Sequence, residues 1–231
     1  MVENSRIAQH DGTVDAAIAA LTATVIAYWT AVELNLSRVF SGTPTVSSAR
    51  TQLTQQLGSL GDLITPVLND QLSMLGYSNS GYTPTRNQLR DSAVELITQT
   101  NSGAFETLMA AVALSIISGG EAVAARLSLE TLAKSLSGGV TRSIQDTVVA
   151  TDSAYGIYIM RDRGVERFTY AGGVIDTTRE FCESHVDKTY SEVEIRRIWS
   201  SQTWGGKKPG DPFVTRGGYN CRHHWIPDAQ Q

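Results

Sequence analysis

The chain has 231 residues, of which 41% are apolar and 18% are charged, a globular composition with room for one or two cores. Its formal net charge of −4 argues against a general nucleic-acid-binding protein, which normally carries a basic surplus. It has only two cysteines, which excludes a disulfide framework and favours synthesis and assembly in a reducing cytoplasm.

Charged and aromatic residues are unevenly distributed along the chain. Residues 1–159 hold 8 basic and 13 acidic side chains, whereas residues 160–231 hold 11 and 10. Three of the four tryptophans follow Tyr155. We therefore predict an aliphatic, alanine-rich core in the first part of the chain and an aromatic core in the second.

The first part of the sequence shows the periodicity of amphipathic helices. Apolar residues recur at three- and four-residue steps from Thr13, a candidate cap, to about Phe40. A second such pattern runs from about Ser48 to Leu75. Pro66 lies inside it and should kink or split that helix.

The next helix is predicted to begin at a capping box and to end near Thr100. Thr85 and Gln88 form a capping-box pattern for a helix that reaches about Thr100, and Asn101-Ser102-Gly103 should end it. The segment Phe105–Ile117 is apolar nearly all round, which predicts a buried central helix.

Two more helices are predicted after the buried one. Glu121–Leu136 forms the first, and Ser137-Gly138-Gly139 is expected to end it and to mark a domain boundary. Thr141–Asp162 forms the second, with Gly164 as its C-cap. We predict a mainly α N-terminal region of four to five helices in residues 1–137.

No membrane-spanning segment is expected. The longest uncharged apolar runs are Ala16–Val32 and Thr107–Gly120, and both fall short of the roughly 20 residues that a spanning helix needs. The segment from Met1 to Gly12 is polar and lacks the basic region of a targeting sequence. We therefore expect no stable membrane insertion.

The pattern changes after Gly164. Val165–Tyr170 is a candidate strand, and Asp176-Thr177-Thr178 could cap a short helix. Another helix is predicted from Ser191, and a loop rich in Gly, Lys and Pro follows it. The sequence thus predicts a small, irregular α+β domain within residues 138–231.

Both cysteines and three of the four histidines lie in two short segments of that domain. Each segment holds a Cys-x-x-His, Cys182/His185 and Cys221/His224, and the second also reads as Cys-x-His through His223. Paired sulfur and imidazole ligands suit a tetrahedral zinc ion. We predict a structural zinc on Cys182, His185, Cys221 and His223, with His224 as an alternative fourth ligand.

Two other interpretations of this cluster stay open. In a metal-free core, the cysteines are small apolar side chains and the histidines bind backbone groups. A Cys182–Cys221 disulfide, formed in an oxidising environment, would stabilise the fold by roughly 4 kcal/mol. The zinc interpretation is favoured by the size of the domain, because a unit of about 70 residues often needs a covalent or metal cross-link to be stable.

Four basic side chains are candidate phosphate contacts. They are Arg179, Arg222, Lys207 and Lys208. The alternative for the two arginines is a structural pair with a nearby carboxylate. The candidate carboxylates are Glu180, Glu183 and Asp187.

The same segments carry a resemblance to a known family. Arg-x-Phe-Cys-x-x-His, then Lys-x-Tyr-Ser at residues 188–191, then Gly-Gly-Tyr-Asn-Cys-Arg-His-x-Trp-x-Pro resemble the C-terminal domain of Mu F-like minor head proteins, the phage head morphogenesis proteins. The match runs from about Thr141 to Pro227. Many members carry Cys-x-x-Cys and His-Pro-x-Cys-Arg-Cys instead. Here His185 and His223 replace two cysteines, and Gly218 stands where the additional histidine would be.

The resemblance implies a structural role in the virion head of a tailed bacteriophage. Such a protein lies near the portal vertex and aids head assembly, genome packaging or ejection. Its expected partners are portal subunits, the major capsid protein and other copies of itself, and DNA would be contacted through phosphates only. The uncharged helical runs agree with several copies buried against neighbours in a particle.

Two alternative functions follow from the same residues. A zinc-dependent nuclease or toxin-like enzyme could use His223, His224, Arg222 and Glu183 as base, acid and anion binder. The chain has no HExxH, P-loop, GxSxG or paired-carboxylate motif, so we expect no enzymatic activity. The other alternative is an internal protein ejected with the genome, with Phe105–Ile117 as a membrane-active segment.

Overall fold

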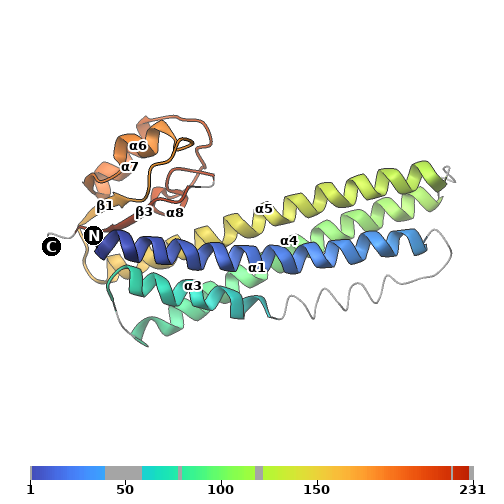
Figure 1. The fold of residues 1–231 in the computed structure, drawn as a ribbon, viewed down its shortest axis with the longest axis horizontal. Coiled ribbons are helices and arrows are strands. Elements are labelled where there is room, and N and C mark those ends of the chain that lie inside the picture. Colours follow the sequence, from blue (N-terminus) through green and yellow to red (C-terminus); the bar gives the residue numbers. More distant parts are fainter. Residues whose placement is uncertain (1, 40–58, 78–79, 118–121, 220, 229–231) are drawn as a thin grey trace. The chain divides into compact units, whose positions relative to one another are not determined.

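The fold is taken from a computed structural model, and the structure describes residues 2–39, 59–77, 80–117, 122–219 and 221–228. The N-terminal elements are the helices α1 (Val2–Val39), α3 (Leu60–Met74), α4 (Thr83–Ile117) and α5 (Ala122–Asp162), and the 3-10 turn η1 (Ser80–Tyr82) precedes α4 (Figure 1).

The chain after α5 forms a small α+β lobe, which we call the C-terminal lobe (residues 165–228). Its elements in chain order are β1 (Arg167–Ala171), α6 (Glu180–His185), β2 (Thr189–Ser191), α7 (Glu192–Ser201), α8 (Pro212–Thr215) and β3 (His224–Pro227). The predicted fold class, a helical N-terminal region followed by a small irregular α+β domain, is confirmed.

The chain divides into two compact units. The first unit comprises Met1–Asp15, Thr65–Arg90 and Val148–Gln231, and the second comprises Ala16–Ile64 and Asp91–Thr147. The C-terminal lobe therefore shares a unit with the beginning of α1. The boundary predicted between residues 137 and 138 lies inside α5 and inside the second unit.

Two predicted helix breaks are wrong. Helix α4 continues through Asn101-Ser102-Gly103, and α5 continues through Ser137-Gly138-Gly139. Asn101 is buried, and its side-chain amide donates a hydrogen bond to the Ile97 carbonyl inside the helix, 3.2 Å away. A helical glycine costs only about 1 kcal/mol relative to alanine, so packing of the surrounding apolar face can outweigh it.

Helix starts also differ from the prediction. Helix α1 begins before Thr13, whose hydroxyl instead donates hydrogen bonds to the Gln9 carbonyl and to Asp70. Helix α3 is unbroken although it contains Pro66. The predicted helix start at Ser48 lies outside the described residues.

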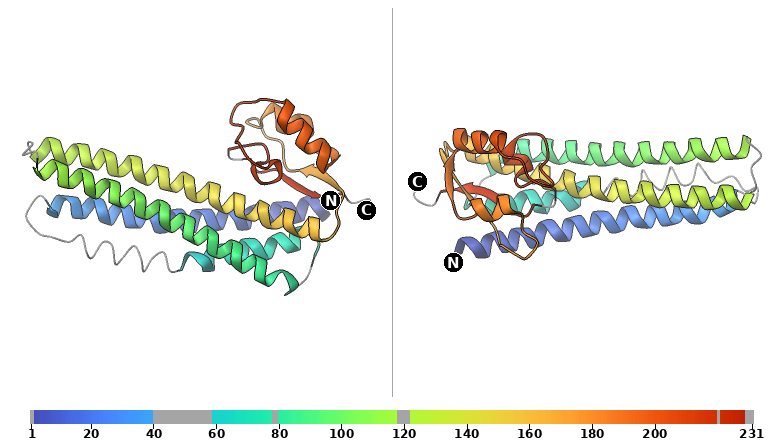
Figure 2. Two further views of the ribbon diagram at one scale, coloured as in Figure 1. Left: turned by 180° about the vertical axis from the view of Figure 1, so that it is seen from behind. Right: turned by 90° about the horizontal axis from the view of Figure 1, so that it is seen from above.

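The second unit is a set of long helices with a mainly aliphatic core. Its portions of α1, α4 and α5 run lengthwise beside one another (Figures 1 and 2). The rings of Tyr28 and Phe105 lie 6.2 Å apart. Other buried side chains are Leu21, Trp29, Ile97, Leu108 and Ile144. Leu114 is 68% exposed, so the predicted all-round burial of Phe105–Ile117 is wrong.

Helix α1 contains one stretch, Ser5–Glu33, that is long and apolar enough to cross a membrane by length and composition alone. That stretch includes Arg6, Asp11, Asp15 and Glu33 and is longer than the uncharged run Ala16–Val32 on which the expectation is based. The observation is weak evidence for a membrane span, because the core helix of a soluble protein passes the same test.

A three-stranded antiparallel sheet forms the centre of the C-terminal lobe, with β1 between β2 and β3. Phe168 and Tyr170 alternate with Thr169 along β1, and both aromatic rings are buried. Tyr170 pairs with Trp225 across the sheet, with ring centroids 4.5 Å apart. The predicted strand and the predicted aromatic core are confirmed.

The two longer helices of the lobe begin differently. Ser191 caps α7 through a capping box with Glu194, and Ile195 and Trp199 are buried beneath it. Helix α6 has Arg179 as its N-cap residue and no side-chain cap, so the capping predicted for residues 176–178 is wrong.

Candidate metal centre

Four side chains from three parts of the C-terminal lobe converge on one buried point. Cys182 lies in α6, Tyr170 lies in β1, and Cys221 and His223 directly precede β3. The two Sγ atoms are 3.9 Å apart, and Cys221 Sγ is 3.7 Å from His223 Nδ1. The structure thus brings together Cys182, Cys221 and His223, whose ligand atoms all lie within 4.8 Å of one another. We call these three residues the thiol centre.

These distances fit a tetrahedral zinc ion. With Zn–S bonds of about 2.3 Å and Zn–N bonds of about 2.0 Å, tetrahedral angles separate two sulfurs by about 3.8 Å and sulfur from nitrogen by about 3.5 Å. The separations of 3.9 Å and 3.7 Å agree with those values. Both cysteines are free thiols in the structure, so the disulfide is not formed.

The pairing of β1 with β3 positions His223. Ala171 pairs with His224, so His223 lies beside Gly172, where an added Cβ would be only 2.8 Å from the imidazole ring. Gly172 also has a φ of 152°, a backbone conformation that favours glycine. The Tyr170 ring stacks on His223, with centroids 5.1 Å apart. The close approach of Gly172 and the stacked Tyr170 ring together restrict the orientation of the imidazole.

Gly217 brings the chain against the thiol centre. A Cβ at this position would lie 2.4 Å from Cys182 Sγ, 2.8 Å from Cys221 Sγ and 3.0 Å from the Tyr170 hydroxyl oxygen. Only glycine allows this approach. The sequence analysis identified neither Tyr170 nor Gly217 as a site residue, because no spacing rule connects them with the cysteines.

The two thiols differ in their readiness to ionise. Their mutual hydrogen bond is the main reason that the pKa of Cys221 is lowered and the pKa of Cys182 is raised. Burial raises the pKa of Tyr170 well above its usual value, so its neutral hydroxyl can donate a hydrogen bond to the Cys221 sulfur, 3.2 Å away. The centre therefore favours one thiolate, and a bound cation would release the second proton.

His185 does not join the thiol centre. Its Nδ1 lies 2.7 Å from the Tyr190 hydroxyl and its Nε2 lies 3.4 Å from the Gln202 side-chain oxygen. Although it follows Cys182 by three residues on α6, both ring nitrogens face other partners. Three of the four predicted zinc ligands are thus brought together.

His224 lies in a different set of contacts. Its Nε2 is 2.8 Å from Asp11 Oδ1 and its Nδ1 is 3.0 Å from an Arg216 nitrogen. The structure therefore gives no support to His224 as the alternative fourth ligand of the thiol centre. Burial lowers the pKa of His224, with Arg216 adding to that effect.

A cavity of about 380 Å³ opens onto the thiol centre. Asp11, Thr177, Thr178 and Arg179 contribute to its wall, together with the three thiol-centre residues. Structural zinc sites normally have four protein ligands, whereas catalytic ones keep a position for water or substrate. The described residues supply three ligands and a cavity, an arrangement that leaves room for an exchangeable fourth ligand.

The four candidate phosphate contacts are all engaged within the chain. Arg179 donates hydrogen bonds to the carbonyls of Gly205 and Tyr219, and Arg222 pairs with Asp15. Arg222 thus has a carboxylate partner, as the alternative interpretation expected. That partner is Asp15 of α1 and not one of the three candidate carboxylates named from the sequence.

The two lysines are held similarly. Lys207 donates hydrogen bonds to the carbonyls of Trp199 and Gln202, and Lys208 lies over the Tyr219 ring, 4.8 Å from its centroid. These contacts occupy the ammonium groups of both lysines and so weaken their ability to bind a phosphate.

Comparison with protein-family models, with curated proteins and with solved structures finds no match to this chain. The likeness to Mu F-like minor head proteins therefore rests on the residues of the two cysteine- and histidine-bearing segments.

Proposed function

We propose that the chain is a structural minor head protein of a tailed bacteriophage, acting near the portal vertex in head assembly, genome packaging or ejection. In this proposal a zinc ion on Cys182, Cys221 and His223 holds the C-terminal lobe together. Its partners are portal subunits, the major capsid protein and other copies of the chain.

The observation that supports an assembly role best is the exposure of large apolar side chains on the long helices. Leu114 is 68% exposed, Leu127 is 60% exposed, and Leu96 and Ile26 are about half exposed. All four lie in the second unit. Burying such a side chain against a neighbour stabilises an interface by about 1.5–3 kcal/mol, so several of them can support a stable contact.

The metal has a structural purpose in this proposal. Cys182 and Cys221 are 39 residues apart in sequence, and a shared ion would join α6 to the segment before β3. Binding free energy of a structural zinc contributes directly to folding, which suits a small lobe with short strands and long loops.

The assembly role predicts a specific effect of one surface charge. Leu114→Lys should lower incorporation of the protein into particles by about tenfold or more, since a desolvated lysine costs at least 1.4 kcal/mol at an interface. Folding should be unchanged, because Leu114 is mostly exposed. The measurement is the ratio of this chain to portal protein in purified virions, together with imaging of the portal vertex.

Ala113→Lys is the matched control, since Ala113 is exposed on the same helix but lies about 100° around its axis from Leu114. Equal loss for both variants would show a general intolerance of charge. Wild-type chain that is a monodisperse monomer and is absent from virions would refute the proposal.

A second candidate is a zinc-dependent hydrolase, which the cavity beside three metal ligands favours. Against it, the Asp11 carboxylate accepts a hydrogen bond from His224 and Arg179 is bound to backbone carbonyls. Neither is poised as a base or an anion binder.

We therefore expect no nuclease activity from the zinc-loaded protein. The measurement is cleavage of single- and double-stranded DNA and of RNA by pure protein. Cleavage that is lost in His223→Gln and kept in His185→Gln would support the hydrolase and contradict the structural proposal.

A further inference from the structure

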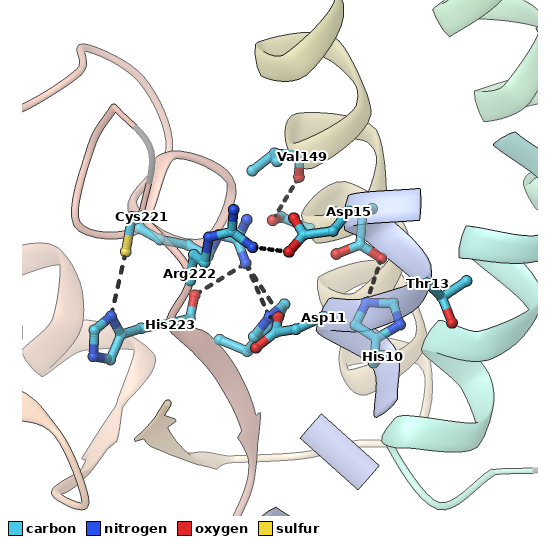
Figure 3. A network of polar contacts seen from close by, with 12 residues as sticks. His10, Asp11, Thr13, Asp15, Val149, Cys221, Arg222 and His223 are labelled. Atoms are coloured by element: carbon cyan, nitrogen blue, oxygen red, sulfur yellow. Dashed lines mark hydrogen bonds and ion pairs between the residues drawn. The ribbon is translucent and has the colours of Figure 1, made fainter. Parts of the chain in front are cut away.

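Two histidines from opposite ends of the chain face one buried carboxylate in the first unit. His10 lies in α1, Asp152 lies in α5 and His224 lies in β3, and their exposed fractions are 0%, 1% and 4%. One ligand atom from each residue lies within 4.8 Å of those of the other two. Figure 3 shows the polar contacts around His10 and Asp11, with Cys221 and His223 in the same view.

Each imidazole is oriented by a second carboxylate. His10 Nδ1 lies 3.3 Å from Asp70 Oδ2, and His224 Nε2 lies 2.8 Å from Asp11 Oδ1. A histidine that binds a metal usually donates its other ring N–H to a carboxylate, which fixes the tautomer. In the tautomers that donate those N–H groups to Asp70 and Asp11, His10 Nε2 and His224 Nδ1 carry the lone pairs.

The atoms that face one another form an ion pair but no well-aligned hydrogen bond. His10 Nε2 lies 3.0 Å from Asp152 Oδ1, but without hydrogen-bond geometry. Both Asp152 oxygens and His10 Nε2 are buried and receive no hydrogen bond from the described residues. Ligand atoms on an ion with bonds of about 2.1 Å are separated by about 3.0–3.4 Å, which matches the observed contact. Such atoms need a cation or a proton between them.

Charge also favours a dication. Asp11, Asp70 and Asp152 carry three formal negative charges, Arg216 carries one positive charge, and the difference is −2 when both imidazoles are neutral. Burial by itself lowers the pKa of His10, but attraction by Asp152, Asp70 and Asp11 outweighs it and raises that pKa. A proton on His10 is thus the competitor of a metal ion at this place.

Arg216 is the second competitor. Its Nη1 donates a hydrogen bond to the His223 carbonyl and lies 3.0 Å from His224 Nδ1. A metal ion on His224 requires this guanidinium to keep the carbonyl contact and leave the imidazole.

We propose that His10, Asp152 and His224 form a second metal site, for a divalent first-row transition ion such as zinc. Imidazole and carboxylate ligands without sulfur suit zinc, manganese or iron(II) in this arrangement. The site joins the beginning of α1 to the C-terminal lobe, uses none of the thiol-centre ligands and does not depend on the proposed virion role.

The two sites can be distinguished by metal content and by cobalt absorption. Cobalt(II) bound to thiolates shows intense charge-transfer bands, which a nitrogen and oxygen site lacks. Wild-type chain should bind about two zinc ions. His10→Gln should bind about one zinc ion and keep the thiolate bands, whereas Cys221→Ser should lose the thiolate bands and, because it unfolds the lobe that carries His224, the second ion as well.

Asp152→Asn, which keeps the side-chain shape, gives the same readout if His10→Gln fails to fold. Asp70→Asn should weaken this site about 10- to 100-fold without affecting the thiolate bands. Arg216→Gln should strengthen zinc binding at this site, because it removes the competing cation.

Wild-type protein that binds one zinc ion per chain, with the thiolate bands present, would overturn the proposal and leave the thiol centre intact. An Asp152→Asn variant that still binds two zinc ions would overturn it as well. Weaker zinc binding in Arg216→Gln would also contradict the proposal. It would show that Arg216 stabilises this cluster of side chains and does not compete with a metal ion for it.

Discussion

Cys221→Ser should abolish metal binding at the thiol centre and unfold the C-terminal lobe while the long helices persist. Structural zinc contributes about 10–16 kcal/mol of apparent binding free energy in zinc-finger peptides. Loss of even part of this binding free energy would exceed the free energy of unfolding of a small lobe. The near-ultraviolet circular dichroism should collapse, since Tyr170, Phe181, Trp204 and Trp225 pack in this lobe. The far-ultraviolet helical signal should change little, because α1, α3, α4 and α5 lie outside it.

The histidines provide a matched control for this prediction. His185→Gln should keep its zinc, because both ring nitrogens of His185 face Tyr190 and Gln202. His223→Gln, in contrast, should lose zinc as Cys221→Ser does. A His185→Gln variant that loses zinc while His223→Gln retains it would reverse the ligand assignment. Unchanged melting of the wild-type protein after chelation would refute a structural metal altogether.

Gly217→Ala should disrupt the thiol centre without touching a ligand. Its Cβ would lie 2.4 Å from Cys182 Sγ and 2.8 Å from Cys221 Sγ, so the sulfurs must move. Metal–ligand distances tolerate a shift of about 0.2 Å, and overpacking a buried position costs about 1–3 kcal/mol. We expect zinc affinity to fall by about tenfold or more, measured by competition with a chelator of known affinity.

Gly173→Ala is the control, because an added Cβ there would meet no atom within 4 Å. It lies in another loop of the same lobe, after β1, and lines the cavity beside the thiol centre, so this variant should bind zinc as tightly as the wild-type chain. Equal loss of affinity in both variants would indicate a general effect on the lobe, and unchanged affinity in Gly217→Ala would contradict the packing described for the thiol centre.

Local signals in the sequence determined part of the structure. The capping box at Ser191 and Glu194 begins α7, the C-cap at Gly164 ends α5, and β-forming residues from 165 to 170 give the central strand. The Cys/His spacing identified Cys182, Cys221 and His223 as neighbours. These features follow from residue type and short-range geometry, which a sequence displays directly.

Other features required the tertiary structure. Helix α4 continues through Gly103 and α5 through Gly139, because packing along a long helix outweighs the small local preference of glycine. Cys182 and His185 have the spacing of a ligand pair, yet Tyr190 and Gln202 hold the imidazole elsewhere.

The partners of the second site are the clearest case. His10 and His224 lie 214 positions apart in the sequence. No motif around either histidine predicts that it contacts the other. Their meeting at Asp152 depends on the placement of α1, α5 and β3 in one unit. The sequence by itself determined the helical region, the α+β lobe and the thiol pair. Only the tertiary structure decided which histidine joins which site, because side-chain direction is set by packing between distant segments.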